Sequence, residues 1–189
     1  MFILCDTSSI LMLFRLAPDM FTNPAFECIT LQEMHNELKR TPRFRDKYPW
    51  IKECLTQIKA QGLASYKNSP FPENLKLIDA YVFTKPNEKT GRFFNLSYPD
   101  KIVITYAVTN GCRITTGDRA LADFAMQEFE IENISALGLL NHWIEKGVIT
   151  IDKSKLLLLE QWDTLDEPVQ PAAEKLRFKK LTGYSYPGA

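Results

Sequence analysis

The chain has 189 residues, enough to bury one sizeable core, and its 23 lysine and arginine residues balance 23 aspartate and glutamate residues, so the formal net charge at pH 7 is +0. This balance excludes a global field that would draw the chain onto nucleic acid or an anionic membrane, and any such binding must come from local basic segments. The 4 cysteines are spaced neither as zinc ligands nor as a disulfide scaffold, and neither a signal-peptide pattern nor a membrane-length apolar segment is present, so we expect reduced thiols and a cytoplasmic protein.

The amino-terminal part of the chain alternates short apolar segments with amphipathic ones. Residues 1–6 (MFILCD) predict a buried parallel strand, and residues 8–16 predict the helix behind it. Residues 26–30 predict a second short strand, which is followed by a helix over residues 31–40 (LQEMHNELKR). Because ligands bind at the carboxyl ends of the strands in open α/β folds, we expect Asp6 to lie at a binding edge.

The middle of the chain is less regular. Residues 41–48 are basic and broken by proline, and residues 49–59 predict an amphipathic helix. A short third strand is expected over residues 63–66 and a further helix over residues 74–83. Residues 84–95 are polar and basic and contain proline and glycine, so they predict a mobile loop.

The third quarter of the chain returns to alternating strands and helices. A capping-box pattern, Ser97-Tyr98-Pro99-Asp100, opens a helix that ends at Gly111. The elements expected after it are, in order, a strand over residues 112–116, a helix over residues 119–127, a strand over residues 128–131 and a helix over residues 135–146.

Short strands alternating with helices predict the α/β fold class, with a parallel sheet and right-handed crossovers. The pattern ends near residue 150, so residues 1–150 are expected to form the folded domain and residues 151–189 a carboxyl-terminal extension. Three roles for this extension stay open: packing on the domain, dimerisation, or partial disorder.

Three aspartates follow apolar strands or open a helix. Asp6 ends the first strand, Asp118 follows the fourth, and Asp100 lies in a helical first turn. In a parallel sheet the first two meet at one edge, where helices also begin, and a glutamate from the helix over residues 31–40 can join them. Carboxylates brought together repel one another unless a cation neutralises them, and hard oxygen ligands without His or Cys suit Mg²⁺ or Mn²⁺.

Each acid also has a purely structural interpretation. Asp100 could be the reciprocal acid of a capping box with Ser97, and Asp118 could be a turn residue or a helix cap. The glutamates of the second helix would by default form a solvated face. Asp6 is harder to explain in this way, because a carboxylate that ends an apolar strand is costly unless a partner compensates it.

Four segments, taken in this order, resemble a PIN domain: ILCDTSS, a helix carrying ELKR, SYPDKIVITYA and TGDRAL. The resemblance covers roughly residues 1–150 and depends on the conjunction of the motifs. It implies a three-layer α/β/α fold with a central parallel sheet of about five short strands. It also implies a metal-dependent endoribonuclease, which in many members is the toxin of a toxin–antitoxin pair and in others processes ribosomal or messenger RNA.

The resemblance further implies which residues act. Asp6, Asp100 and Asp118 would be the metal-binding and catalytic acids, with Thr7 or Ser8 assisting at the end of the first strand. The cofactor would be Mg²⁺ or Mn²⁺, which activates a water for attack on a phosphodiester bond, leaving 5′-phosphate and 3′-hydroxyl ends.

The fourth acid has two candidates. Glu37 fits the E-L-K-R pattern and is favoured as the catalytic glutamate, whereas Glu33 follows Ile29 and Thr30 in a second pattern and is kept as the substitute. Both lie on one helix face because they are four residues apart. Asp123, five residues after Asp118, is a secondary candidate or a solvated helix residue.

RNA, the substrate that the resemblance implies, would have to meet local cations. Arg40 and Arg43 follow the glutamates, and Lys85, Lys89 and Arg92 lie in the loop before the third acid. Ordinary solvated surface is the alternative interpretation of both segments. The partners expected are RNA, a cognate antitoxin protein and a second copy of the chain in a homodimer, with no membrane. A non-catalytic PIN-like module that binds RNA or protein is the alternative function.

Overall fold

The structure of the chain is a computed structural model that describes residues 2–60, 70–166 and 170–187. The strand expected over residues 63–66 lies outside these residues. No helix in the described ranges combines the length and the apolar character needed to cross a membrane.

The described strands form a parallel sheet with the order β2-β1-β3. The central strand β1 (Ile3–Cys5) pairs with β2 (Cys28–Ile29) on one side and with β3 (Arg113–Thr115) on the other. Every residue of β1 is buried, which explains its uniformly apolar sequence, because helices cover both faces of a parallel sheet. The predicted α/β class with a parallel sheet is confirmed, but the described residues contain three strands rather than five.

The strand expected over residues 128–131 is wrong. Glu128 and Phe129 instead complete helix α7 (Arg119–Phe129), and Glu130 ends it in the left-handed conformation with φ of 55°. The ring of Phe129 packs against that of Phe124 with 5.9 Å between centroids. Phe129, which fits the alternating pattern of a strand, therefore packs as the last residue of a helix. A single parallel bridge between Ile114 and Asn133 is what remains of the pairing in the described part of the chain.

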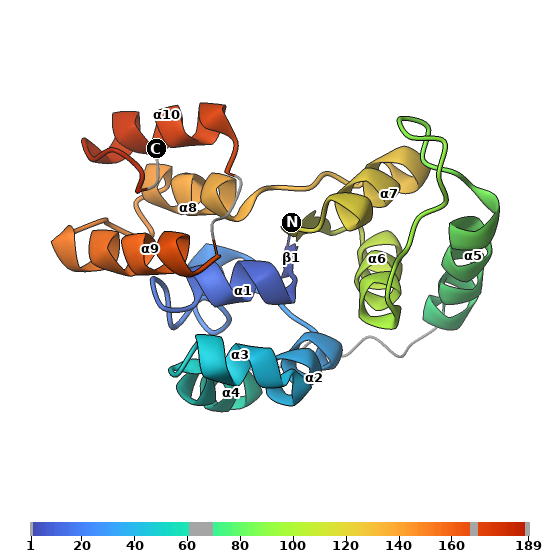
Figure 1. Ribbon diagram of the computed structural model, residues 1–189, viewed down its shortest axis with the longest axis horizontal. Coiled ribbons are helices and arrows are strands. Elements are labelled where there is room, and N and C mark those ends of the chain that lie inside the picture. The colour runs from blue at the N-terminus through green and yellow to red at the C-terminus, as the bar shows by residue number, and fades with distance from the viewer. Residues whose placement is uncertain (1, 61–69, 167–169, 188–189) are drawn as a thin grey trace.

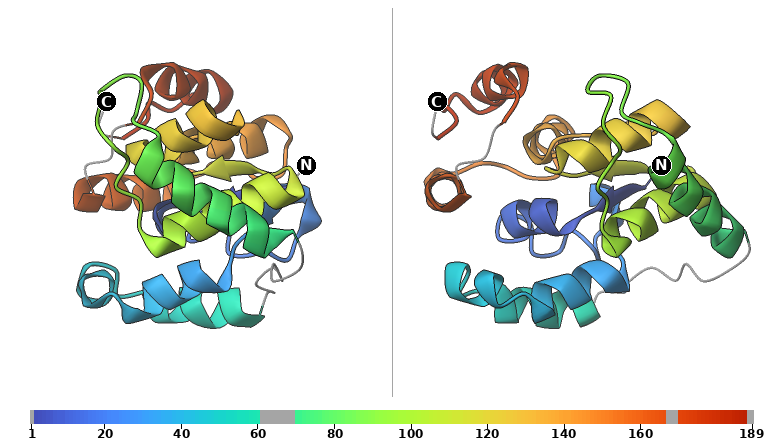
Figure 2. Two further views of the ribbon diagram at one scale, coloured as in Figure 1. Left: turned by 90° about the vertical axis from the view of Figure 1, so that its right-hand side faces the viewer. Right: turned by 45° about the vertical axis from the view of Figure 1, so that its right-hand side comes forward.

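Helices occupy most of the chain between the strands. Figure 1 shows α2, α3 and α4 grouped together on one side of α1, and Figure 2 shows α5 beside α6 in both views. The helices up to β3 are α1 (Thr7–Leu13), η1 (Pro24–Phe26, a short 3-10 helix), α2 (Gln32–Arg40), α3 (Pro42–Lys47), α4 (Ile51–Ala60), α5 (Phe71–Thr84) and α6 (Tyr98–Asn110).

Two segments were predicted to be irregular, residues 41–48 and residues 84–95. The first contains a helix in the structure, and the second is mostly a loop. The sequence identified residues 41–48 only as basic and broken by proline, but they contain α3. Pro42 is compatible with this helix because it lies in the first turn, where the N–H group that proline lacks would have no partner within the helix. The loop expected over residues 84–95 begins at the end of α5 and contains one isolated antiparallel bridge, between Pro86 and Phe93.

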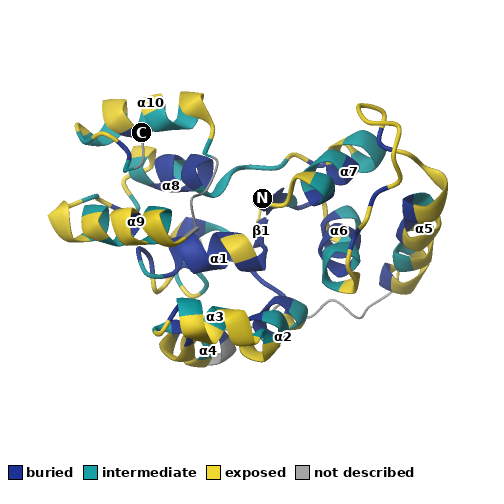
Figure 3. Cartoon of the chain, viewed as in Figure 1, coloured by how far each residue is buried: buried dark blue, intermediate teal, exposed yellow. Residues whose placement is uncertain are grey.

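The carboxyl-terminal extension forms two helices, α9 (Lys153–Asp166) and α10 (Ala172–Thr182), where the sequence pattern indicated none. Helix α10 lies along α8 (Ala136–Glu145), and the fully buried Asn141 donates from Nδ2 to the backbone oxygen and to Oε2 of Glu174, both at 2.8 Å. Phe178 is fully buried and meets Tyr186 with 5.7 Å between ring centroids. Figure 3 shows α1 buried over most of its length, whereas α9 and α10 keep exposed outer faces. The described part of the extension therefore packs on the rest of the chain.

Candidate functional site

A cavity of about 710 Å³ lies at the carboxyl edge of the sheet. Four carboxylates that are far apart in the sequence line it: Asp6, Glu37, Asp100 and Asp118. The parallel topology accounts for this convergence, since β1 and β3 end at the same edge and the helices that follow them begin there. The structure thus brings together the four acids expected to be catalytic.

Asp6 follows β1 and caps helix α1. Its Oδ1 accepts a hydrogen bond from the Ser9 backbone N–H at 2.9 Å and another from the Ser8 hydroxyl at 2.9 Å. The Thr116 hydroxyl donates to Oδ2. Asp6 is only 8% exposed, and this burial raises its pKa to about 6, although the three donors act in the opposite direction.

Two hydroxyl groups connect Asp6 to the segment that follows β3. Ser8 Oγ accepts from the Gly117 backbone N–H at 2.9 Å, and Thr116 Oγ1 accepts from the Asp118 backbone N–H at 2.9 Å. Both hydroxyls then donate to Asp6. A Cβ at Gly117 would stand 3.1 Å from Ser8 Oγ, so the close approach of the two strand ends favours glycine there. The positions of Asp6 and Asp118 are therefore coupled.

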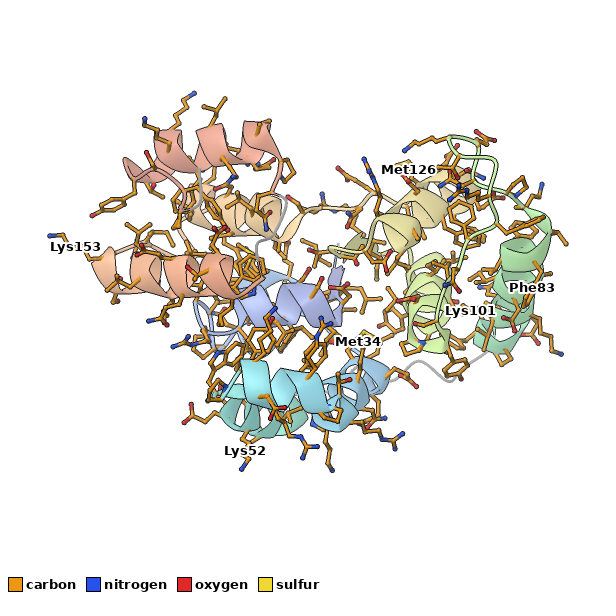
Figure 4. All side chains as sticks on the ribbon, viewed as in Figure 1. Met34, Lys52, Phe83, Lys101, Met126 and Lys153 are labelled. Carbon is orange, nitrogen blue, oxygen red and sulfur yellow. The ribbon has the colours of Figure 1, made fainter. Side chains whose placement is uncertain are left out.

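Glu37 reaches the cavity from α2 through a contact with α1. The Thr7 hydroxyl donates to Glu37 Oε2 at 2.5 Å. Met34, one turn earlier on α2 and labelled in Figure 4, is buried and also lines the cavity. Thr7, expected to assist the metal-binding acids, therefore positions the glutamate in this structure.

Asp100 and Asp118 have the helix-capping roles that their structural interpretation predicts. Asp100 Oδ2 accepts from the Ser97 backbone N–H at 2.8 Å, which completes the predicted capping box of α6. Asp118 Oδ1 accepts from the backbone N–H groups of Ala120 and Leu121 at the start of α7. Capping and a position in the cavity are compatible, because a carboxylate offers about four lone-pair sites.

The donor atoms of the cavity fit a hard divalent cation. Carboxylates with neighbouring hydroxyls are the oxygen ligands that Mg²⁺ and Mn²⁺ prefer. One oxygen each on Glu37, Asp100 and Asp118 accepts no hydrogen bond from a described residue. As the side chains lie, however, no group of three His, Cys, Asp or Glu residues in the described ranges is close enough to hold an ion. A shared ion would therefore require these side chains to rotate towards one another.

The secondary candidates lie elsewhere. Glu33 is half-buried on α2 and is not among the described residues that line the cavity. Asp123 forms an ion pair with Lys89 at 2.5 Å, and the hydrogen bond from Lys89 lowers the pKa of Asp123. Ser8 lines the cavity, and its hydroxyl donates to Asp6 Oδ1.

The expected RNA-binding cations divide into two groups. Arg43 of α3 lines the cavity. Arg40, Lys85, Lys89 and Arg92 are exposed and do not belong to the described lining. The Lys85 ammonium instead lies over a ring of α5, 5.6 Å from its centroid.

Sequence reasoning missed several cavity residues. Arg119 directly follows Asp118, and its position beside a candidate acid was the signal that could have found it. Asn133 accepts from the Thr116 N–H at 3.0 Å and donates to the Thr116 carbonyl at 3.3 Å, as the backbone of a neighbouring strand would. Trp162 comes from α9, in the extension that the PIN-like motifs do not reach, so no motif pointed to it.

Comparison of the chain with protein-family models, with curated proteins and with solved structures gives no match. The fold and the site together define an α/β protein with an acidic cavity at the carboxyl edge of a parallel sheet. Any narrower assignment has to be argued from the residues of this chain.

Proposed function

We propose that the chain is a PIN-like, metal-dependent endoribonuclease that hydrolyses RNA phosphodiester bonds at the acidic cavity. The observation that carries the proposal is the convergence of Asp6, Glu37, Asp100 and Asp118 on one concave site. Carboxylates that line one cavity offer the hard oxygen ligands that a divalent cation prefers. A bound divalent cation would also favour the ionised form of Asp6, which burial opposes.

Asp6, Asp100 and Asp118 would hold the cation in this proposal, with Glu37 as a further catalytic acid in the same cavity. A bound Mg²⁺ or Mn²⁺ supplies Lewis acidity and a water of lowered pKa. The residues of the chain fix the direction of the acids: Ser9 and Thr116 orient Asp6, and Thr7 orients Glu37. Guanidinium groups pair well with phosphate oxygens, so Arg43 and Arg119 are suited to hold the RNA backbone beside the acids.

Cleavage of end-labelled RNA tests the proposal. We expect cleavage with Mg²⁺ or Mn²⁺, none with EDTA, and 5′-phosphate ends on the products. Asp118→Asn should lower kcat about 100-fold or more, as the loss of one electrostatic contact at a reacting centre typically does. Asp123→Asn is the matched control on the same helix, because its carboxylate is paired with Lys89, and it should retain full activity. Cleavage that persists in EDTA, or full activity of Asp6→Asn, would overturn the proposal.

A toxin role is a narrower proposal that rests on the resemblance alone. Expression of the chain should then arrest growth, and a protein encoded beside it should relieve the arrest. Harmless expression of an active ribonuclease would contradict this role.

The second candidate function is a non-catalytic PIN-like module that binds RNA or protein. The capping hydrogen bonds of Asp100 and Asp118 favour it, because they give both acids a structural task. Titration calorimetry with Mn²⁺ separates the two functions. Heat of binding that disappears in Asp118→Asn supports the enzyme, whereas the absence of both binding and thermal stabilisation supports the module.

A further inference from the structure

The acidic cavity has a second lining made of aromatic and cationic side chains. Arg43 and Phe44 come from α3, and Tyr48 follows that helix. Trp162 comes from α9 in the carboxyl-terminal extension, so two segments separated by more than half of the chain build this wall together. Neither the metal-binding acids nor their hydrogen-bond partners account for it.

The rings in this wall differ in accessibility. Tyr48 is only 2% exposed and lies behind the others, with its centroid 6.1 Å from that of Phe44 and 5.6 Å from that of Trp50. Phe44 and Trp162 are half-buried and border the cavity. These two rings are therefore the ones whose surface a ligand in the cavity can meet.

Trp162 is packed on one side and borders the cavity on another. It also lines a much smaller apolar pocket with Leu11 of α1 and Leu158 of its own helix, so part of the ring is packed between α1 and α9. Its indole N–H is shielded from solvent, and no described residue accepts a hydrogen bond from it. An unmade hydrogen bond of this kind is costly, and a phenylalanine would avoid the cost, so packing alone does not explain an indole here.

We propose that this wall, which the carboxyl-terminal extension helps to build, is a nucleobase subsite. An unpaired base stacks on Trp162 and Phe44, while Arg43 and Arg119 hold the phosphates that lead to the acids. Aromatic side chains bind unpaired bases through stacking, and basic grooves follow the backbone. Bases inside an RNA duplex are stacked on one another and do not offer their faces. This inference rests on the proposed function, since it names a subsite of the same cavity.

Binding measured in EDTA tests the subsite without cleavage. The ligands are a fluorescein-labelled single-stranded RNA, the same strand with abasic positions, and a blunt RNA duplex, each followed by anisotropy with the full chain. We expect the single strand to bind more tightly than the abasic strand and the duplex. Trp162→Leu should weaken binding of the single strand about 5- to 150-fold, the range for loss of one stacked base. It should leave binding of the abasic strand unchanged, because the phosphates are the same.

Phe83→Leu is the control. Phe83 of α5 is 72% exposed and is not part of the described cavity lining. Its replacement should leave RNA binding unchanged. Equal losses in the two variants, or equal affinity of the intact and abasic strands, would overturn the subsite.

A second measurement does not depend on the folding of the leucine variant. Tryptophan fluorescence of the unmodified chain should be quenched by the single strand, and the quenching should be absent in Trp162→Phe, which keeps an aromatic ring. Identical quenching in both proteins would also overturn the subsite.

The subsite and the ribonuclease activity can fail separately. Binding that depends on Trp162, without cleavage in Mn²⁺, would overturn the proposed function and support the subsite. Cleavage by Trp162→Leu with an unchanged KM would overturn the subsite and leave the ribonuclease in place.

Discussion

At the scale of single residues, two opposing effects on Asp6 decide how the site responds to protons. Its three donors favour the carboxylate, but burial favours the neutral acid more strongly, so its pKa rises from 3.8 to about 6. The folded chain therefore binds this proton more tightly than the unfolded chain does. Ionisation of Asp6 therefore lowers the free energy of unfolding. The loss develops as the pH rises from the pKa of Asp6 in the unfolded chain to its pKa in the folded chain.

The first prediction concerns the stability of the EDTA-treated protein. The difference in free energy of unfolding between the unmodified chain and Asp6→Asn should fall by about 3 kcal/mol across the range from about pH 4 to pH 6, and stay constant above it. Urea denaturation at a series of pH values measures this difference. Adding Mn²⁺ above pH 6 should restore stability to the unmodified chain and not to the variant, because the cation neutralises the carboxylate.

Asp123→Asn provides the control for this experiment. The ion pair with Lys89 lowers the pKa of Asp123, so the sign is reversed: its contribution to stability is present at neutral pH and is lost as the pH falls through the lowered pKa. A flat difference curve for Asp6→Asn between pH 4 and 7 would show that the carboxyl of Asp6 is solvated.

At the scale of elements, features that depend on contacts between residues close in the sequence could be predicted, and features that depend on tertiary contacts could not. The caps at Ser97 and Asp118 could be predicted because each depends on hydrogen bonds to residues at most three positions away. The strand over residues 128–131 could not be excluded, because Phe129 and Ile131 alternate with polar residues as a strand would. The structure excludes that strand because Phe129 completes α7, where its ring packs against that of Tyr81 of α5 with 5.8 Å between centroids, and this is a tertiary contact.

The same limit applies to the candidate site. Asp6 and Asp118 could be placed together because parallel strands share a carboxyl edge. Trp162 could not, because its position depends on how α9 packs against α1, which no local pattern encodes. The two helices of the extension were not predicted for the same reason, because they pack on the rest of the chain through scattered residues such as Leu159 and Phe178.

Packing of the extension leads to a prediction about cooperativity. Phe178 on α10 is fully buried, whereas Leu176 on the same helix is 71% exposed. Phe178→Ala should lower the free energy of unfolding by about 3–5 kcal/mol, and Leu176→Ala should change it by less than about 0.5 kcal/mol. Urea denaturation followed by circular dichroism measures both. An unshifted main transition in Phe178→Ala would mean that α10 unfolds independently of the sheet.

At the scale of the whole molecule, a net charge of +0 means that the proposed RNA binding would depend on a few local cations. Within the described part of the chain, Arg43 and Arg119 are the cations that line the cavity. The four carboxylates in the same cavity would repel a phosphate backbone unless a cation neutralised them. In the proposed complex, stacking on Trp162 would supply affinity that does not depend on charge, which a protein with no net charge needs in order to bind a single strand.

The salt dependence of RNA binding tests how the affinity is divided between contacts of the arginines with phosphates and stacking on Trp162. Each phosphate neutralised on a single strand contributes about −0.7 to the slope of log Kobs against log salt, so two arginines predict a slope of about −1.4 in EDTA. Arg43→Gln should reduce the slope by about 0.7, because one contact is lost. Arg92→Gln, in the exposed loop, should leave it unchanged, since Arg92 is not part of the described lining. Anisotropy titrations over a range of KCl concentrations give these slopes. A slope steeper than about −4 would require around six phosphate contacts, and RNA would then have to bind across a much wider basic surface than the cavity provides.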